Sequence, residues 1–369
     1  MDFRVYHYGA RGVFDGTKPV YGPASGLGWP MHYRYPPLFL LLFAPLASLP
    51  LGAAAAVWVV GKTATLAWLI AAMRKHGLPA VPDYRACAVA FFIIAPYLIE
   101  DFRYGNVQFF IVALTMSALL VVRDRPVLAA TSLALAASIK VWPAIFLPYL
   151  AVRGQRRCVI YALGFVAVLA VLPAVYFGPA ENFNLLGEWF SQEFRTQLSE
   201  SEIWFPSQSL RGVLMRYLTR IDYSRVPDSN YASVNVAQLD PATIRLVWMI
   251  VAVAAYGGFL ILSHRRRWSD GWLDAALAFC LVALLEPFTQ KYALVVLLWP
   301  ALALLRLPNK PVPRLLTYAA AILVMIQPFV PGANAQRLLQ VLGFDFAAVV
   351  MLSGSFAVAC GLESDLSQH

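Results

Sequence analysis

Three places in the sequence combine charged side chains with neighbours that can form hydrogen bonds. Asp2 lies near the start of the chain, and Glu100 and Asp101 come directly before the stretch from Arg103 to Gln108. A carboxylate in such a setting can act as a general base that removes a proton from a hydroxyl group. Lys140 lies between two short apolar stretches, and a fixed ammonium group stabilises negative charge on a reacting molecule. These residues are the first candidates for a catalytic site.

Each candidate also has a simpler interpretation. Asp2 can be a solvated acid near the end of the chain. Glu100 and Asp101 can belong to a solvated helix start, where acids and Asn are favoured. Lys140 can extend its ammonium group to lipid headgroups, and Lys291 can do the same. The charge of Lys62, in the middle of an apolar run, can be paired within a helix bundle.

The composition places these residues in a membrane protein. Hydrophobic residues make up 60% of the chain and charged residues 13%, and the mean hydropathy is +0.64. These values exclude an ordinary soluble domain. A helical crossing of a bilayer needs about 20 apolar residues. Uncharged runs cover Tyr104–Val122, Cys158–Ala180, Leu246–Ser263, Leu315–Gln336 and Phe346–Leu362.

The sequence therefore predicts an all-α fold, a polytopic transmembrane helix bundle. About 9–11 membrane segments are expected, short and re-entrant ones included. The loops between the runs alternate between basic clusters and stretches rich in acids, Trp, Tyr, Asn and Gln. Basic loops mark the cytoplasmic side, so the second set of loops is expected outside.

Two predicted hairpins have arms too short to cross a bilayer. Residues 126–139 and 141–152 form the first pair of half-length helices, and their tip is Lys140. The second hairpin is Trp272–Leu305, whose arms meet at the polar segment Glu286–Lys291. Irregular backbone at membrane depth is tolerated only inside protein or against a water-filled cavity. We therefore expect a cavity at these tips.

The predicted organisation has five parts. Residues 1–35 are an external N-terminal loop, before which a first helix is expected to be missing. Residues 36–177 form a first transmembrane module, 178–241 a long external loop and 242–362 a second transmembrane module. Residues 363–369 are a cytoplasmic tail.

Several short motifs follow one another in a characteristic order. They are Asp2–Tyr6, Gly16–Tyr21, Tyr35-Pro36-Pro37-Leu38, Gly105–Gln108, Lys140-x-x-Pro143, Gln208-Ser209-Leu210 with Arg216, and Pro287-x-Thr289-x-Lys291. In this order the chain resembles glycosyltransferase family 87, the polyprenol-phosphate-mannose-dependent mannosyltransferases of the GT-C membrane class. Two departures concern substrate identity: Ser207 stands where the family usually has Asn, and the Trp and His common in the Pro287 motif are absent.

The resemblance implies a hexosyltransferase of the bacterial plasma membrane whose active site faces outside. It would move a hexose, mannose in the first instance, from a polyprenyl-phosphate-linked donor to a glycolipid or glycan acceptor. It also implies that Asp2 is the general base. Glu100 and Asp101 are the alternative carboxylates, because they come just before Arg103 and the Gly105–Gln108 stretch. The residues expected to bind substrate are Tyr35, Arg103, Asn106, Gln108, Lys140, Gln208, Ser209 and Lys291.

No cofactor is expected. The predicted external loops contain no Asp-x-Asp pair, and the histidines have no metal-binding spacing. Nucleotide-sugar enzymes often use such a pair to hold a divalent ion, so its lack favours metal-independent transfer from a lipid monophosphate. Inverting transfer is expected because it needs one carboxylate on the face opposite the leaving group. Nucleic-acid binding is not expected, because no RNA-binding motif is present.

Two other classes of protein share parts of this pattern. A membrane transporter or lipid flippase would carry ion-coupling residues near the midplane and broken helices in repeated halves. Here the carboxylates lie at predicted external helix ends, and no half-repeat is visible. A non-catalytic subunit would present the long external loop to a partner and would need no alignment of polar tips.

Overall fold

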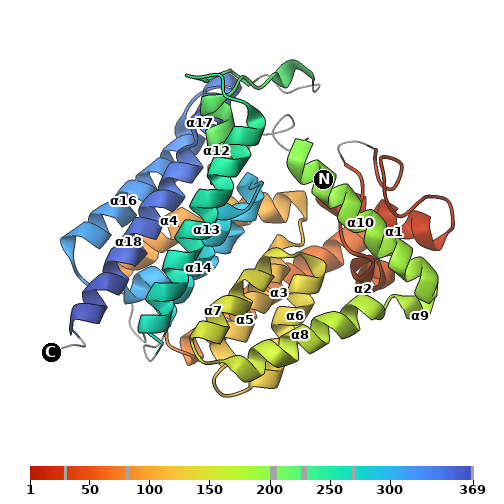
Figure 1. Ribbon diagram of the computed structural model, residues 1–369, viewed down its shortest axis with the longest axis horizontal. Coiled ribbons are helices and arrows are strands. Elements are labelled where there is room, and N and C mark those ends of the chain that lie inside the picture. Colours follow the sequence, from red (N-terminus) through yellow and green to blue (C-terminus); the bar gives the residue numbers. More distant parts are fainter. Residues whose placement is uncertain (29–30, 80–82, 200–205, 226–230, 268–270, 367–369) are drawn as a thin grey trace. The chain divides into compact units, whose positions relative to one another are not determined.

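A computed structural model describes residues 1–28, 31–79, 83–199, 206–225, 231–267 and 271–366. The regular structure in these residues is helical, with no strand among them (Figure 1). This confirms the predicted all-α polytopic bundle. The chain divides into two compact units, Met1–His76 with Ile99–Leu198, and Gly77–Leu98 with Ser199–His369.

The chain contains both full-length and shorter apolar helices, as predicted. In the described part of the chain, five segments are long and apolar enough to cross a membrane: Leu51–Lys75, Arg156–Phe177, Pro241–Arg265, Pro311–Phe329 and Phe344–Gly361. Shorter apolar helices cover Pro37–Ala47, Gln108–Val121, Pro126–Ile139, Trp142–Val152 and Trp272–Leu285. Large apolar side chains stay exposed on the long helices, which is the surface that lipid would cover.

The first unit is built around α6, whose small side chains let neighbouring helices approach closely. In α6, Ala129, Ala130, Ala134 and Ala136 are buried, and the helix packs against α5 and α8. The helices of this unit are α1 (Asp2–Phe14), α2 (Pro37–Ala47), α3 (Leu51–Lys75), the end of α4 (Tyr84–Tyr104), α5 (Gln108–Val121), α6 (Pro126–Ile139), η1 (Trp142–Ile145), α7 (Phe146–Val152), α8 (Arg156–Val171), α9 (Ala174–Phe177) and α10 (Pro179–Ser199).

An aromatic cluster anchors α1 to this unit. The rings of Phe3 and Tyr6 lie against those of Phe43 and Trp58, with centroids 5.5 to 6.3 Å apart. Edge-on and tilted ring contacts of this kind add stability beyond the buried area. The cluster therefore fixes the helix that carries Asp2.

The second unit is centred on α14, nearly all of whose side chains are buried. A helix that is apolar on every side belongs in the core of a bundle. In Figure 1, α16 and α18 run along each other, and α14 also packs against α18. Besides the start of α4, this unit contains α12 (Leu210–Leu218), η2 (Tyr223–Arg225), α13 (Pro241–Arg265), α14 (Trp272–Leu285), η3 (Lys291–Leu297), α15 (Leu298–Ala303), η4 (Leu304–Arg306), α16 (Pro311–Ile326), η5 (Gln327–Phe329), α17 (Ala333–Leu342) and α18 (Phe344–Leu366).

Both predicted hairpins break where the sequence indicates. Lys140 ends α6 in an extended conformation, with φ −146° and ψ 133°. In the second hairpin α14 ends at Leu285, and Lys291 opens η3. The half-length helices are therefore present, with a lysine at or next to each break.

The predicted loops contain more helix than hydropathy reveals. Residues 1–35 include α1, and residues 178–241 include α10 and α12. These helices are amphipathic and carry no long apolar run, so hydropathy along the sequence does not indicate them. The boundaries of the two units differ from those of the predicted modules 36–177 and 242–362, because α4 contributes residues to both units.

The predicted tail 363–369 begins within a helix. In it, α18 continues to Leu366, and residues 367–369 lie outside the described part.

Candidate functional site

Four of the predicted site residues form one hydrogen-bonded chain in the first unit. Oδ2 of Asp2 accepts a hydrogen bond of 2.5 Å from the side-chain amide of Asn106. Oδ1 of Asn106 accepts one of 2.8 Å from the backbone N–H of Gln108. Oε1 of Gln108 accepts one of 2.9 Å from Nζ of Lys140. The candidate base and the candidate cation are thus connected, although they are far apart in the sequence.

A tight turn at Gly105 places Asn106 beside Asp2. Gly105 lies between α4 and α5 with φ +66°, a conformation that L side chains rarely adopt. A Cβ atom here would lie 2.7 Å from Cβ of Phe3, and the Gly105 carbonyl accepts a hydrogen bond of 3.0 Å from Trp58. Glycine therefore allows the close approach between this turn and α1.

The surroundings of Asp2 suit a base. The side chain is half-buried, and its burial raises the pKa of the carboxyl above its ordinary value. The hydrogen bond from Asn106 and nearby positive charges, that of Lys140 among them, oppose this rise in pKa. A carboxylate whose pKa lies closer to neutral pH is a more effective general base.

Tyr35 is linked to the same turn. Its hydroxyl lies 2.8 Å from that of Tyr6, and the Tyr6 hydroxyl accepts a hydrogen bond of 3.4 Å from the backbone N–H of Val107. Burial and then the negative charge of Asp2 raise the pKa of Tyr35. Tyr35 therefore stays protonated as a hydroxyl donor next to the candidate base.

The alternative carboxylates are engaged elsewhere. Asp101 forms an ion pair with Lys62, and both side chains are fully buried. Nζ of Lys62 also donates a hydrogen bond of 3.0 Å to the Asp101 carbonyl. Glu100 forms a 3.4 Å ion pair with Arg103, whose side chain is 73% exposed. Both alternative carboxylates thus have a charged partner, and Lys62 is paired within the bundle.

In the second unit, Gln208 and Ser209 hold two loops together. The backbone N–H of Gln208 donates a hydrogen bond of 2.7 Å to the Thr289 carbonyl, and the Ser209 hydroxyl donates one of 3.2 Å to the Pro287 carbonyl. The side-chain amide of Gln208 donates to the carbonyls of Pro206 and Gln340, each at 2.9 Å. The side chains of Gln208 and Ser209, which were predicted to bind substrate, are buried. Their hydrogen bonds in this structure are to other parts of the protein.

Lys291 belongs to a second polar chain that the sequence did not reveal. Its Nζ donates a hydrogen bond of 3.1 Å to Oε1 of Gln327, and Nε2 of Gln327 donates one of 2.7 Å to Oδ1 of Asp345. The hydroxyl of Tyr97 donates to the same oxygen at 2.8 Å. A signal for Asp345 was available, since it is an acid at the start of an apolar run that can span the membrane.

The predicted site residues are divided between the two units. Asp2, Tyr35 and Lys140 lie in the first unit, with Glu100, Asp101, Arg103, Asn106 and Gln108. Gln208, Ser209 and Lys291 lie in the second. Only in the first unit do a carboxylate and a cation from the predicted set share one hydrogen-bonded chain in the described residues.

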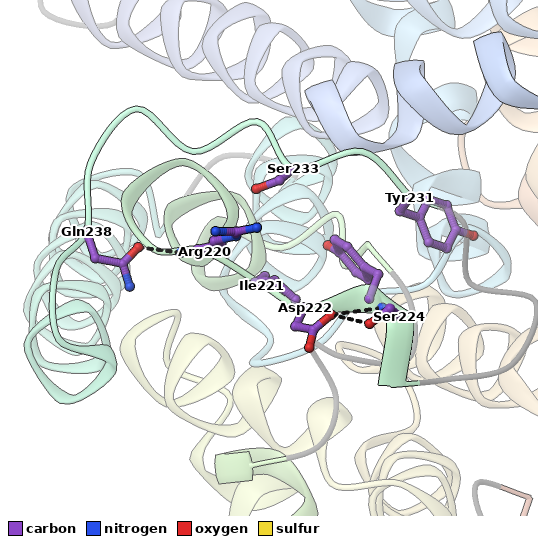
Figure 2. Close-up of a pocket in the computed structure, with 8 residues that line it drawn as sticks. Arg220, Ile221, Asp222, Ser224, Tyr231, Ser233 and Gln238 are labelled. Carbon is purple, nitrogen blue, oxygen red and sulfur yellow. Dashed lines mark hydrogen bonds between the residues drawn. The ribbon is translucent and has the colours of Figure 1, made fainter.

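A surface cavity of about 550 Å³ lies in the second unit. Figure 2 shows its lining, in which the Asp222 carboxylate accepts hydrogen bonds from the backbone and hydroxyl of Ser224. Arg220, Tyr231 and Gln238 also line it. The lining is polar, and none of the predicted site residues belongs to it.

No metal site is evident in the part of the chain that the structure describes. Among these residues, no group of three or more His, Cys, Asp or Glu side chains is placed so that it could hold an ion. The lack of a metal requirement stays a prediction, which an activity assay can test.

Comparison with known proteins identifies relatives of the chain. The sequence model of glycosyltransferase family 87 matches residues 33–234. A polyprenol-phosphate-mannose-dependent alpha-(1-2)-phosphatidylinositol mannoside mannosyltransferase of Mycobacterium tuberculosis is 30% identical over 190 residues, which are 47% of this chain and 44% of the relative. A polyprenol-phosphate-mannose-dependent alpha-(1-2)-phosphatidylinositol pentamannoside mannosyltransferase of Mycolicibacterium smegmatis is 29% identical over 215 residues, 54% of this chain and 52% of the relative.

These alignments span about half the length of each curated relative. No solved structure matches the chain. The family match covers more than half of the chain, including Tyr35, the turn from Gly105 to Gln108, Lys140 and Gln208. The chain therefore belongs to glycosyltransferase family 87.

Proposed function

We propose that this protein is a membrane glycosyltransferase that takes a hexose, mannose in the first instance, from a polyprenyl-phosphate-linked donor. The acceptor is a glycolipid or glycan on the outer face of the membrane. Family membership and the polyprenol-phosphate-mannose dependence of the two relatives support the donor class. The observation that carries the proposal is the chain from Asp2 through Asn106 and Gln108 to Lys140.

The reaction needs one base and one positive charge. Asp2 removes the proton from the acceptor hydroxyl as that oxygen attacks the anomeric carbon. The new bond forms on the face opposite the phosphate, so the configuration inverts. The bond between the anomeric carbon and the phosphate oxygen breaks, and polyprenyl phosphate leaves with the electron pair. Lys140 stabilises the charge that develops on this leaving group.

Asn106 and Gln108 position these two groups. The Asn106 amide donates to one oxygen of Asp2, which favours the ionised carboxylate and orients the other oxygen toward the acceptor. The side-chain carbonyl of Gln108 accepts from Lys140, and Trp142 donates to the same oxygen at 3.4 Å. A lysine held in this way does not have to be ordered again when the donor binds.

A lipid monophosphate leaving group carries less charge than a nucleoside diphosphate. A single fixed lysine can therefore take the place that a divalent ion holds in many nucleotide-sugar enzymes. We accordingly propose that the transfer is independent of metal ions.

A transfer assay with purified protein tests the proposal. The protein is reconstituted in nanodiscs and incubated with radiolabelled polyprenyl-phosphate mannose or polyprenyl-phosphate glucose and with membrane glycolipids. Formation of a labelled product, with free polyprenyl phosphate in equal amount, is expected for at least one donor. Movement of the labelled donor between leaflets without a product would instead indicate a flippase and would overturn the proposal.

A further inference from the structure

One side of α10 carries a line of exposed aromatic rings. Phe183, Phe190 and Phe194 are 78%, 65% and 58% exposed. Their spacing of seven and four residues places them on one stripe of the helix. The rings of Phe190 and Phe194 are stacked, with centroids 6.1 Å apart and planes inclined by 15°. Three phenylalanines in one line are more than the scattered apolar residues of an ordinary water-exposed surface.

Another side of α10 is fixed to the first unit. Nε1 of Trp189 donates a hydrogen bond of 3.1 Å to the Arg34 carbonyl, and Nε2 of Gln192 donates one of 2.9 Å to the Tyr33 carbonyl. The guanidinium of Arg34 donates two hydrogen bonds of 3.0 Å to the carboxylate of Glu193. The aromatic stripe thus stays exposed although the helix itself is well held.

The third side of α10 is polar. Glu181, Asn184 and Glu188 are exposed, and their helical positions lie between the packed side and the aromatic stripe. The helix therefore presents one side to the protein, one apolar side and one acidic side. A division into a charged face and an aromatic, apolar face is typical of a helix that lies in the plane of a membrane surface.

The connection to the preceding helix places the start of α10 at a membrane boundary. Residues Arg156–Phe177 are one of the segments able to cross a bilayer. Gly178, with φ +85°, then turns the chain directly into α10, and Figure 1 shows α9 followed by α10. Near the end of this span, Val171, Val175 and Tyr176 are 64%, 86% and 55% exposed. The chain thus passes within a few residues from an exposed apolar span into the aromatic stripe, and this continuity along the chain selects lipid as the partner.

We infer that α10 is an interfacial helix that inserts Phe183, Phe190 and Phe194 into the lipid at the membrane surface where the span ends. The acidic side then faces water. Through Trp189, Gln192 and Glu193, the helix holds the segment that ends at Arg34, just before Tyr35. The inference goes beyond the proposed glycosyl transfer and does not depend on it.

Spin labelling in nanodiscs tests this placement without an activity assay. Phe190→Cys and Phe194→Cys are each labelled in a Cys87→Ala background, since the three other native cysteines are buried. Glu188→Cys, on the acidic side of the same helix, is the matched control. Collision rates with oxygen, which concentrates in lipid, and with a water-soluble nickel complex are measured for each label.

We expect the ratio of oxygen to nickel collision rates to be several-fold higher at positions 190 and 194 than at position 188. Nickel access at 190 and 194 as high as at 188 would place the stripe in water and overturn the inference. Low access to both reagents would show that a second copy or another protein covers the stripe, which would also overturn it. Gel filtration checks that the labelled proteins are folded. A Phe183→Cys variant tests the third position of the stripe, where the same high ratio is expected.

Discussion

The side-chain carbonyl of Gln108 holds the ammonium group of Lys140 at a distance of 2.9 Å. Gln108 opens α5, and Lys140 ends α6. The hydrogen bond therefore connects the ends of two neighbouring helices at a point where the backbone is irregular. Asn106, two residues before Gln108, extends this connection to Asp2.

Asp2→Asn should slow glycosyl transfer by about 10²–10⁴-fold, the usual contribution of a general base. Donor affinity should change little, because the base acts on the acceptor. Turnover and donor binding are measured separately on the purified variant. Asp15→Asn is the control, since Asp15 is an exposed acid at the other end of α1 and should tolerate the change. Full activity of Asp2→Asn would show that the base is misassigned.

The pH dependence of turnover should report the ionisation of Asp2. The base is active when ionised, so turnover should fall as the pH drops through its pKa. Because burial raises this pKa, the midpoint should lie above the ordinary value for Asp of about 3.9. The charge of Lys140 lowers the pKa of Asp2, so Lys140→Met should move the midpoint of its residual activity to higher pH. A shift to lower pH would contradict the assignment.

Lys140→Met should weaken donor binding and also slow transfer. The charge that Lys140 meets on the phosphate exists in the bound donor and grows in the transition state. Lys140→Arg should restore part of the binding, because it keeps the charge but changes the geometry. Binding of a labelled polyprenyl-phosphate sugar to each variant measures this effect. Unchanged donor affinity in Lys140→Met would exclude a direct contact with the phosphate.

Asp101→Asn should lower stability rather than act only on the chemical step. Removing one partner of a buried ion pair costs about 3–5 kcal/mol, because the other charge stays buried without compensation. Thermal unfolding of Asp101→Asn in detergent should therefore show a lower Tm. A double variant, Lys62→Met with Asp101→Leu, should recover much of the loss. A stable but inactive Asp101→Asn would instead return Asp101 to the list of catalytic candidates.

Chelation should leave transfer unchanged. The proposed charge stabilisation comes from Lys140, and the described residues contain no cluster that could hold an ion. Activity is measured with EDTA and with added Mg²⁺ or Mn²⁺. A strict requirement for a divalent ion would overturn the single-lysine account of the leaving group.

The sequence alone predicted the class of fold and many helix boundaries. Uncharged runs and short arms predicted the bundle and the breaks at Lys140 and after Leu285, because the cost of burying charge and unpaired backbone in lipid is a local property of the chain. The motif order predicted the family, and it selected Asp2, the Gly105–Gln108 turn and Lys140 as candidates.

The tertiary structure decided which of these residues meet. The pairing of Lys62 with Asp101 and the bonds from Asp2 to Lys140 join residues distant in sequence. So does the chain from Lys291 through Gln327 to Asp345. The helices α1 and α10 were also missed, because their apolar residues lie on one side and never form a long run. Hydropathy depends on neighbours along the chain, whereas these contacts depend on how distant helices pack.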